Sequence, residues 1–121
     1  MEKKVQQALE NDLVIDITTK GRRSGKSRRI EIWYHNIDGR LLITGMPGRR
    51  SWFANMKSNP HITFHLKQSA QADIPADVRI IDDEAERRKI LTVIIAGLDG
   101  EHDLEKWVRR SPLVEVLLSQ D

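Results

Sequence analysis

The chain has 121 residues, of which 39% are hydrophobic and 31% charged, a balance typical of a globular domain with its own core and not of a disordered chain. It contains no cysteine, which excludes disulfides and thiolate metal sites. It has neither an apolar run of membrane-spanning length nor a signal-peptide core. We therefore expect one domain over residues 1–121, located in the cytoplasm.

The net charge of +2 conceals a strong asymmetry along the chain. Residues 1–72 hold 13 Lys and Arg against 6 Asp and Glu, whereas residues 73–121 hold 7 against 12. The first part therefore carries +7 and the second −5. Such a local positive potential favours a small anionic ligand or a nucleic-acid backbone as partner.

The first elements predicted along the chain are a helix and two strands. Residues 1–12 form an N-terminal helical segment, because Val5 and Leu9 lie four positions apart. Residues 13–19 and 28–37 both alternate apolar and polar side chains, which is typical of strands with one buried face.

A basic turn, TTKGRRSGKSRR over residues 18–29, joins these two strands. It has no acidic residue, and its basic residues are Lys20, Arg22, Arg23, Lys26, Arg28 and Arg29. Since like charges repel, a hairpin has no structural need for six cations in one place. Glycine amides, serine hydroxyls and arginine forks together suit phosphate or carboxylate oxygens, so the turn predicts an anion site.

A second glycine-containing loop follows the next predicted strand. Asp38-Gly39 predicts a tight turn into a third strand over residues 40–44, so that three consecutive strands would form a meander. The loop over residues 45–51 then carries two adjacent arginines. It precedes a short helix over residues 52–58, with Ser51 as the predicted N-cap. Cations in front of a helix N-terminus make this a second anion-binding element.

The second half of the chain alternates strands and helices. A fourth strand is predicted over residues 61–67, with His61 and His65 on its exposed face, and a metal site there would need a third ligand that the pattern lacks. A fifth strand covers residues 72–81, and Pro75 indicates an edge strand or a bulge. The last elements are a helix from a capping box at Asp83 to about Ala96, a short helix over 104–109 and a sixth strand over 113–118. The fold predicted is mainly β with flanking helices: a six-stranded antiparallel barrel.

Two segments resemble a known family. TTKGRRSGKSRR and, after the DGR turn, GMPGRRSWFANMKSNPHITFHL resemble the deazaflavin (F420)-dependent nitroreductase family. These are split β-barrel proteins of the flavin/deazaflavin oxidoreductase superfamily, with the pyridoxamine-phosphate-oxidase-like fold (an FMN-binding split barrel). The likeness spans residues 13–118 in order.

The resemblance implies a reductase that passes a hydride from reduced coenzyme F420 to a small organic acceptor such as a quinone, an enone or a nitro compound. By position, the residues that would hold the phosphate and acidic tail of F420 are Arg22, Arg23, Ser24, Gly25, Lys26 and Arg28. Those beside the ring would be Ile30, Ile32, Thr44, Gly45, Met46, Pro47, Gly48 and Trp52. Met46 stands where the family pattern has a lysine, a charge that Arg49 or Arg50 would supply. No catalytic acid or base is predicted, and the resemblance implies a homodimer.

Three other interpretations remain open at this point. The same barrel can hold FMN, as an oxidoreductase or a flavin carrier. A barrel whose basic turn grips phosphates can bind nucleic acid, although the cations here are confined to two loops. The turn can also be a solvated charged surface with no ligand, and the resemblance makes this the least favoured interpretation.

Overall fold

The computed structural model describes residues 1–119. Its elements, in chain order, are α1 (Lys3–Asn11), β1 (Val14–Lys20), β2 (Ser27–Trp33), β3 (His35–Ile37), β4 (Arg40–Thr44), α2 (Ser51–Ser58), β5 (His61–Leu66), β6 (Ala72–Ile80), α3 (Glu84–Ala96), α4 (Leu104–Arg110) and β7 (Leu113–Leu118).

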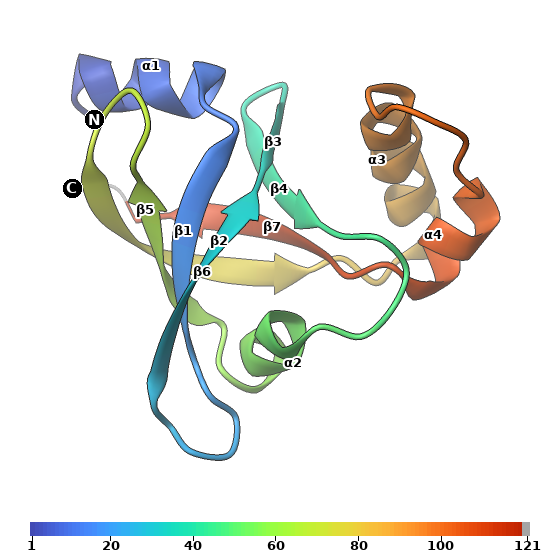
Figure 1. The fold of residues 1–121 in the computed structure, drawn as a ribbon, viewed down its shortest axis with the longest axis horizontal. Helices are drawn as coiled ribbons and strands as arrows, with labels where there is room; N and C mark the ends of the chain where they lie inside the picture. Colours follow the sequence, from blue (N-terminus) through green and yellow to red (C-terminus); the bar gives the residue numbers. More distant parts are fainter. Residues whose placement is uncertain (120–121) are drawn as a thin grey trace.

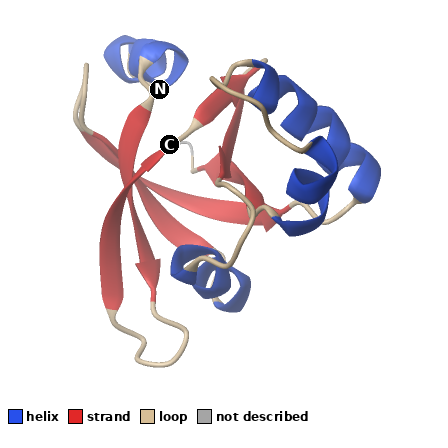
Figure 2. Ribbon diagram, turned by 45° about the vertical axis from the view of Figure 1, so that its right-hand side comes forward, coloured by secondary structure: helices blue, strands red, loops and turns tan. Residues whose placement is uncertain are grey.

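The strands form one antiparallel sheet in the order β2-β1-β5-β6-β7-β4-β3. The sheet curls into a half-barrel, with α1 across one end and α2 at the other, beside the long β1–β2 hairpin (Figure 1). Helices α3 and α4 pack together on a third side (Figure 2). The predicted mainly-β fold with flanking helices is confirmed.

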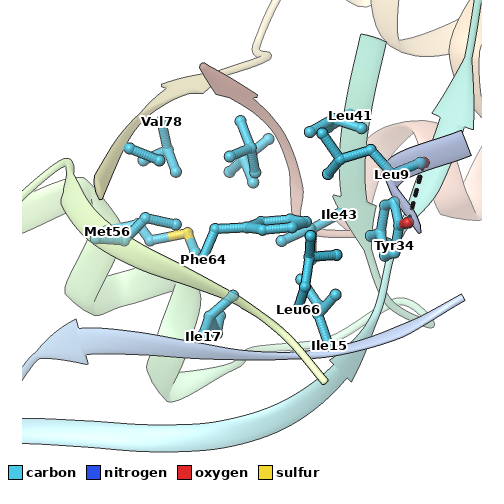
Figure 3. Packing of buried hydrophobic residues seen from close by; sticks show 14 of the residues in the cluster. Leu9, Ile15, Ile17, Tyr34, Leu41, Ile43, Met56, Phe64, Leu66 and Val78 are labelled. Atoms are coloured by element: carbon cyan, nitrogen blue, oxygen red, sulfur yellow. Dashed lines mark hydrogen bonds between the residues drawn. The ribbon is translucent and has the colours of Figure 1, made fainter. Parts of the chain in front are cut away.

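The strand count differs from the prediction, because the second predicted strand is two strands. Tyr34 breaks it: the side chain is buried, its hydroxyl donates to the carbonyls of Ala8 (3.1 Å) and Leu9 (3.0 Å), and its ring meets Phe64 edge-on (Figure 3). The predictions of six strands and of a three-strand meander are therefore wrong. Instead β2 pairs with β1, whereas β3 pairs with β4 at the opposite end of the sheet.

The protein has two apolar cores. The larger lies inside the curled sheet and includes Ile15, Ile17 and Phe64, with Met56 from α2 (Figure 3). The smaller core lies between the sheet and the α3–α4 pair, and Leu91 of α3 is one of its fully buried residues. Apolar residues at alternate strand positions fill the larger core, whereas α3 and α4 supply most of the smaller one.

Two local predictions at element boundaries need correction. Ser51 is the first residue of α2 and not its N-cap; Arg50 occupies that position and its side chain makes no capping bond. Pro75 lies in β6, between β5 and β7, and not in an edge strand. The ladder to β7 begins one residue later, at Ala76, so the proline is tolerated where the pairing on that side has ended. The Asp83 cap is confirmed, since its carboxylate accepts the Glu86 amide at 2.9 Å.

A buried arginine holds the end of α4 in place. Arg87 of α3 donates from its guanidinium to the carbonyls of Val108 (2.8 Å), Ile81 (2.8 Å) and Ser111 (2.6 Å), and more weakly to that of Trp107 (3.4 Å). The Val108 carbonyl lies in the last turn of α4, where it has no partner within the helix, so Arg87 satisfies a group that would otherwise be unpaired. Burial lowers the pKa of Arg87.

A second set of arginines is paired with carboxylates. On β4 and β6, Arg40 and Arg79 both contact Glu86 of α3 and Glu115 of β7, at 2.7–3.2 Å. This network, which we call the paired cluster, ties α3 to the outside of the sheet. Within the described residues no helix is long and apolar enough to cross a membrane.

Candidate functional site

The basic turn is the closed end of the β1–β2 hairpin. The β1–β2 ladder runs to the pair Lys20–Ser27, and beyond it the Gly21 amide donates to the Lys26 carbonyl at 2.8 Å. Gly25 has a φ of 69°, which a residue with a side chain rarely adopts. The Lys26 amide donates to Ser24 Oγ at 3.1 Å. These local bonds use the glycines and Ser24, and the basic side chains of the turn are exposed.

Asn55 of α2 attaches the helix to this turn. Its Oδ1 accepts from the Arg22 amide (3.1 Å) and from Arg22 Nη1 (3.3 Å), and its Nδ2 donates to Thr19 Oγ1 (3.3 Å). The side chain is buried, so these bonds replace those that water would make. Our sequence analysis did not single out Asn55. The signal was the asparagine itself, one turn into a short helix, because asparagine side chains compete for backbone hydrogen bonds and disfavour helix interiors.

Two adjoining hollows lie between the turn and α2. The first, of about 290 Å³, is lined by Gly21, Arg22, Arg23, Ser24, Arg28, Ser51 and Asn55. The second, of about 460 Å³, is lined by Arg22, Arg49, Arg50, Ser51, Phe53, Ala54 and Lys57. The structure thus brings together the basic turn and the loop before α2, two elements predicted separately from the sequence.

The start of α2 adds amide donors to these hollows. The first N–H groups of a helix have no partner inside it, and the Arg50 side chain at the N-cap has no acceptor atom to offer them. Ser51, the first residue of the helix, lines both hollows. Unsatisfied amides and the positive end of the helix dipole both favour an anion here.

The cations that line the hollows lack carboxylate partners. Among residues 1–119, no ion pair involves Arg22, Arg23, Lys26, Arg28, Arg49 or Arg50. In the same turn, Arg29 is the exception and pairs with Asp16 at 2.9 Å. The lining of the two hollows therefore carries positive charge that no carboxylate of the described chain balances, which favours an anionic ligand.

The two arginines of the second loop have different roles. Arg50 folds back under the loop and donates to the carbonyls of Met46 and Arg49, each at 3.0 Å. A Cβ on Gly48, whose φ is 136°, would lie only 3.2 Å from the Arg50 guanidinium. Arg50 therefore braces the loop, whereas Arg49 is exposed and its side chain is available to a ligand.

The residues predicted beside the ring are not gathered into these hollows. Ile30 and Ile32 are half-buried on β2 against the main core, and Trp52 is buried in that core with its ring edge-on to Phe53. In the loop, Thr44 donates to the Pro112 carbonyl at 2.6 Å, and Met46 is exposed. The structure assembles the predicted anion-binding residues more completely than the predicted ring-binding ones.

One prediction about the histidines is wrong. His61 is exposed as expected, but His65 is only 6% exposed although it lies on the outer face of the sheet. Its Nε2 lies 2.7 Å from Thr18 Oγ1 and its Nδ1 2.7 Å from Asp73 Oδ1, which explains how a polar ring is held there. The bond to His65 lowers the pKa of Asp73.

Almost the whole sequence matches the model of one protein family. Residues 1–118 match the model of the F420H(2)-dependent quinone reductases. The chain belongs to that family. This confirms the resemblance drawn from the two motifs, and with it the assignment as an oxidoreductase that depends on reduced F420.

Solved structures agree on the fold of this F420H(2)-dependent reductase. It is similar to a protein described as an F420 reductase (16% identity, 99% of this chain and 96% of that chain, TM-score 0.71). It also resembles an F420-H2 dependent reductase, FDR-A (18% identity, 87% of this chain and 94% of that chain, TM-score 0.57). A third similar structure is that of a candidate pyridoxamine 5'-phosphate oxidase from Listeria innocua (13% identity, 97% of this chain and 92% of that chain, TM-score 0.69). At these identities the likeness establishes the split-barrel fold alone.

Proposed function

We propose that the two hollows hold the phosphate and the first part of the acidic tail of F420, and that the enzyme passes its hydride to a quinone in the cytoplasm. The observation that carries the site is the set of unpaired guanidiniums around the start of α2. Arg22, Arg23 and Arg28 line the first hollow and Arg49 the second. Charge-assisted bonds from such groups are about twice as strong as neutral ones.

The fit of the cofactor rests on the donor set. Guanidinium forks and helix-terminal amides are what phosphate and carboxylate oxygens require, and Asn55 fixes Arg22 in position. Arg49 is the residue that we propose replaces the family's loop lysine, since Arg50 is engaged with backbone carbonyls.

For the ring, we propose the residues predicted from the sequence, which are Ile30, Ile32, Trp52 and the loop over residues 44–48. When bound, the reduced deazaflavin supplies a hydride and a proton, which together convert a quinone into a hydroquinone. The chain's own part is to bind the anionic end, to orient the ring against the apolar edge of β2 and to exclude water there.

We further propose a homodimer. Strand β2 is an outer strand of the sheet and carries Trp33, whose side chain is 60% exposed. Trp33 is close in the chain to the residues predicted beside the deazaflavin ring, and a large exposed aromatic side chain is typical of a surface that contacts a second subunit. Light scattering on the purified protein tests this, and a monomer at micromolar concentration would contradict it.

The experiment that tests the site is a fluorescence titration of the purified protein with F420 and, in parallel, with FMN. We expect quenching of F420, and about a tenfold weaker affinity in the Arg23→Ala variant because one charge-assisted contact is lost. Protein loaded with F420H2 should then reduce a naphthoquinone, followed by the return of oxidised F420 absorbance. Tightly held FMN in the purified protein, or salt-sensitive binding of DNA without any response to F420, would contradict the proposal.

A further inference from the structure

A third hollow continues the two already described. It has a volume of about 470 Å³ and is lined by Gly48, Arg49, Phe53, Lys57, Arg110 and Pro112. It shares Arg49, Phe53 and Lys57 with the second hollow, which in turn shares Arg22 and Ser51 with the first. The three therefore form one track, which runs from the β1–β2 turn along α2 to the end of α4.

The whole track is cationic. No acidic residue is among those that line the three hollows. At its far end stand two residues that our sequence analysis did not select, Lys57 and Arg110. Both are exposed, and neither takes part in an ion pair among residues 1–119. Lys57 is held in place over the Phe53 ring, with Nζ 4.7 Å from its centroid.

The end of α4 would normally repel an anion, since helix C-termini carry partial negative charge. Here three of the last four carbonyls of the helix, those of Trp107, Val108 and Arg110, already accept hydrogen bonds. Arg87 donates to those of Trp107, Val108 and Ser111, and the Gly48 amide donates to that of Arg110 at 3.2 Å. Neutralised in this way, the helix end can border a site for negative charge.

The length of the track indicates an extended ligand with several acidic groups. From Ser51 to Lys57 is six residues of α2, which is about 9 Å along the helix axis. One phosphate cannot contact cations at both ends of that distance. An extended chain with an acidic group on each residue covers it in about three residues.

We propose that the tail of F420 leaves the turn and follows this track along α2, and that its distal carboxylates bind Lys57 and Arg110. This inference rests on the proposed function and adds the direction and the far end of the tail. It follows that affinity increases with the number of glutamates in the tail. The increase is larger at low salt, because exposed charges are screened.

The test compares short-tailed F420, long-tailed F420 and the deazaflavin chromophore without phosphate or tail, each titrated by fluorescence. The variant is Lys57→Gln with Arg110→Gln. The matched control is Lys89→Gln with Arg109→Gln, which removes the same charge from two exposed residues that do not line the track.

We expect the Lys57→Gln/Arg110→Gln variant to bind long-tailed F420 about tenfold more weakly, the order for two exposed charge contacts. Its affinity for the tail-less chromophore should not change, and the control should behave as the original protein. An equal tail-length effect in both double variants would place the tail elsewhere and overturn this inference while leaving the proposed function intact. If no form of F420 quenches, the proposed function itself fails.

Discussion

Arginines have opposite surroundings in two regions of this protein. In the paired cluster, Arg40 and Arg79 are each matched by Glu86 and Glu115. Around the hollows, arginines such as Arg22 and Arg28 have no carboxylate partner within the described chain, and they crowd together in spite of their repulsion. The residue type is the same in both places, and the difference lies in what surrounds it.

Unpaired charge, more than charge itself, is the reason for placing the proposed anion site at the hollows. Paired arginines lower the free energy of the folded state, whereas unpaired and mutually repelling ones raise it unless an anion joins them. Substitutions in the two sets should therefore separate stability from affinity.

The largest expected effect comes from Arg87, which belongs to neither set because backbone carbonyls are its partners. Arg87→Leu should lower the free energy of unfolding by at least about 3 kcal/mol, since it leaves several buried carbonyls without a donor. Urea denaturation followed by circular dichroism measures it. The neighbouring Arg88→Leu, which loses only exposed pairs to Glu84 and Glu105, is the control and should cost less than about 1 kcal/mol. Equal losses in the two variants would refute the role given to Arg87.

The comparison itself is tested most directly by Arg28→Ala and Arg79→Ala. Arg28→Ala should weaken F420 binding by about 1.5 kcal/mol, roughly tenfold, and leave the melting temperature unchanged. Arg79→Ala should leave F420 binding unchanged and lower stability by about 1 kcal/mol. Fluorescence titration and thermal melts on the same preparations measure both quantities. If both variants changed affinity alike, the distinction between the two sets would be lost.

The smallest effect concerns the pH dependence of the paired cluster. The guanidinium of Arg79, followed by that of Arg40, lowers the pKa of Glu86 from 4.5 to about 2. A carboxylate whose pKa is depressed by folding contributes stability that is complete above the unfolded value and is lost as the pH falls through the folded one. We expect the melting temperature to fall between about pH 4.5 and pH 2, and less steeply in Glu86→Gln. Identical acid profiles for the two proteins would show that Glu86 contributes nothing to acid stability.

Much of the fold follows from local patterns in the sequence. The alternation of Ile15 and Ile17, the cap at Asp83 and the stop after α2 all act within a few residues, and the structure has them where expected. What the patterns did not show depends on contacts distant in sequence. Tyr34 breaks a continuous β pattern because α1 offers it two carbonyls, and His65 is buried because Thr18 and Asp73 are beside it in the sheet.

The candidate site divides in the same way. The cations of the turn and Arg49 stand out in the sequence as charge runs next to glycines. Asn55 and Arg110 do not, since only the folded chain brings Asn55 to the turn and Arg110 to the loop before α2. Whether Arg49 or Arg50 is available to a ligand was likewise open until the bonds of Arg50 to its own loop were known.

The pairing of β4 with β7 has a consequence for the order of assembly. Residues 41–44 pair with residues 113–116, Thr44 donates to the Pro112 carbonyl, and the loop beyond β4 donates from the Gly48 amide to the Arg110 carbonyl. During synthesis, the basic hairpin can form as soon as residue 33 has emerged, but the second half of the binding surface must wait for some eighty further residues, as sequence-distant contacts generally do. A nascent chain would thus present the basic hairpin long before the loop in front of α2 is anchored beside it.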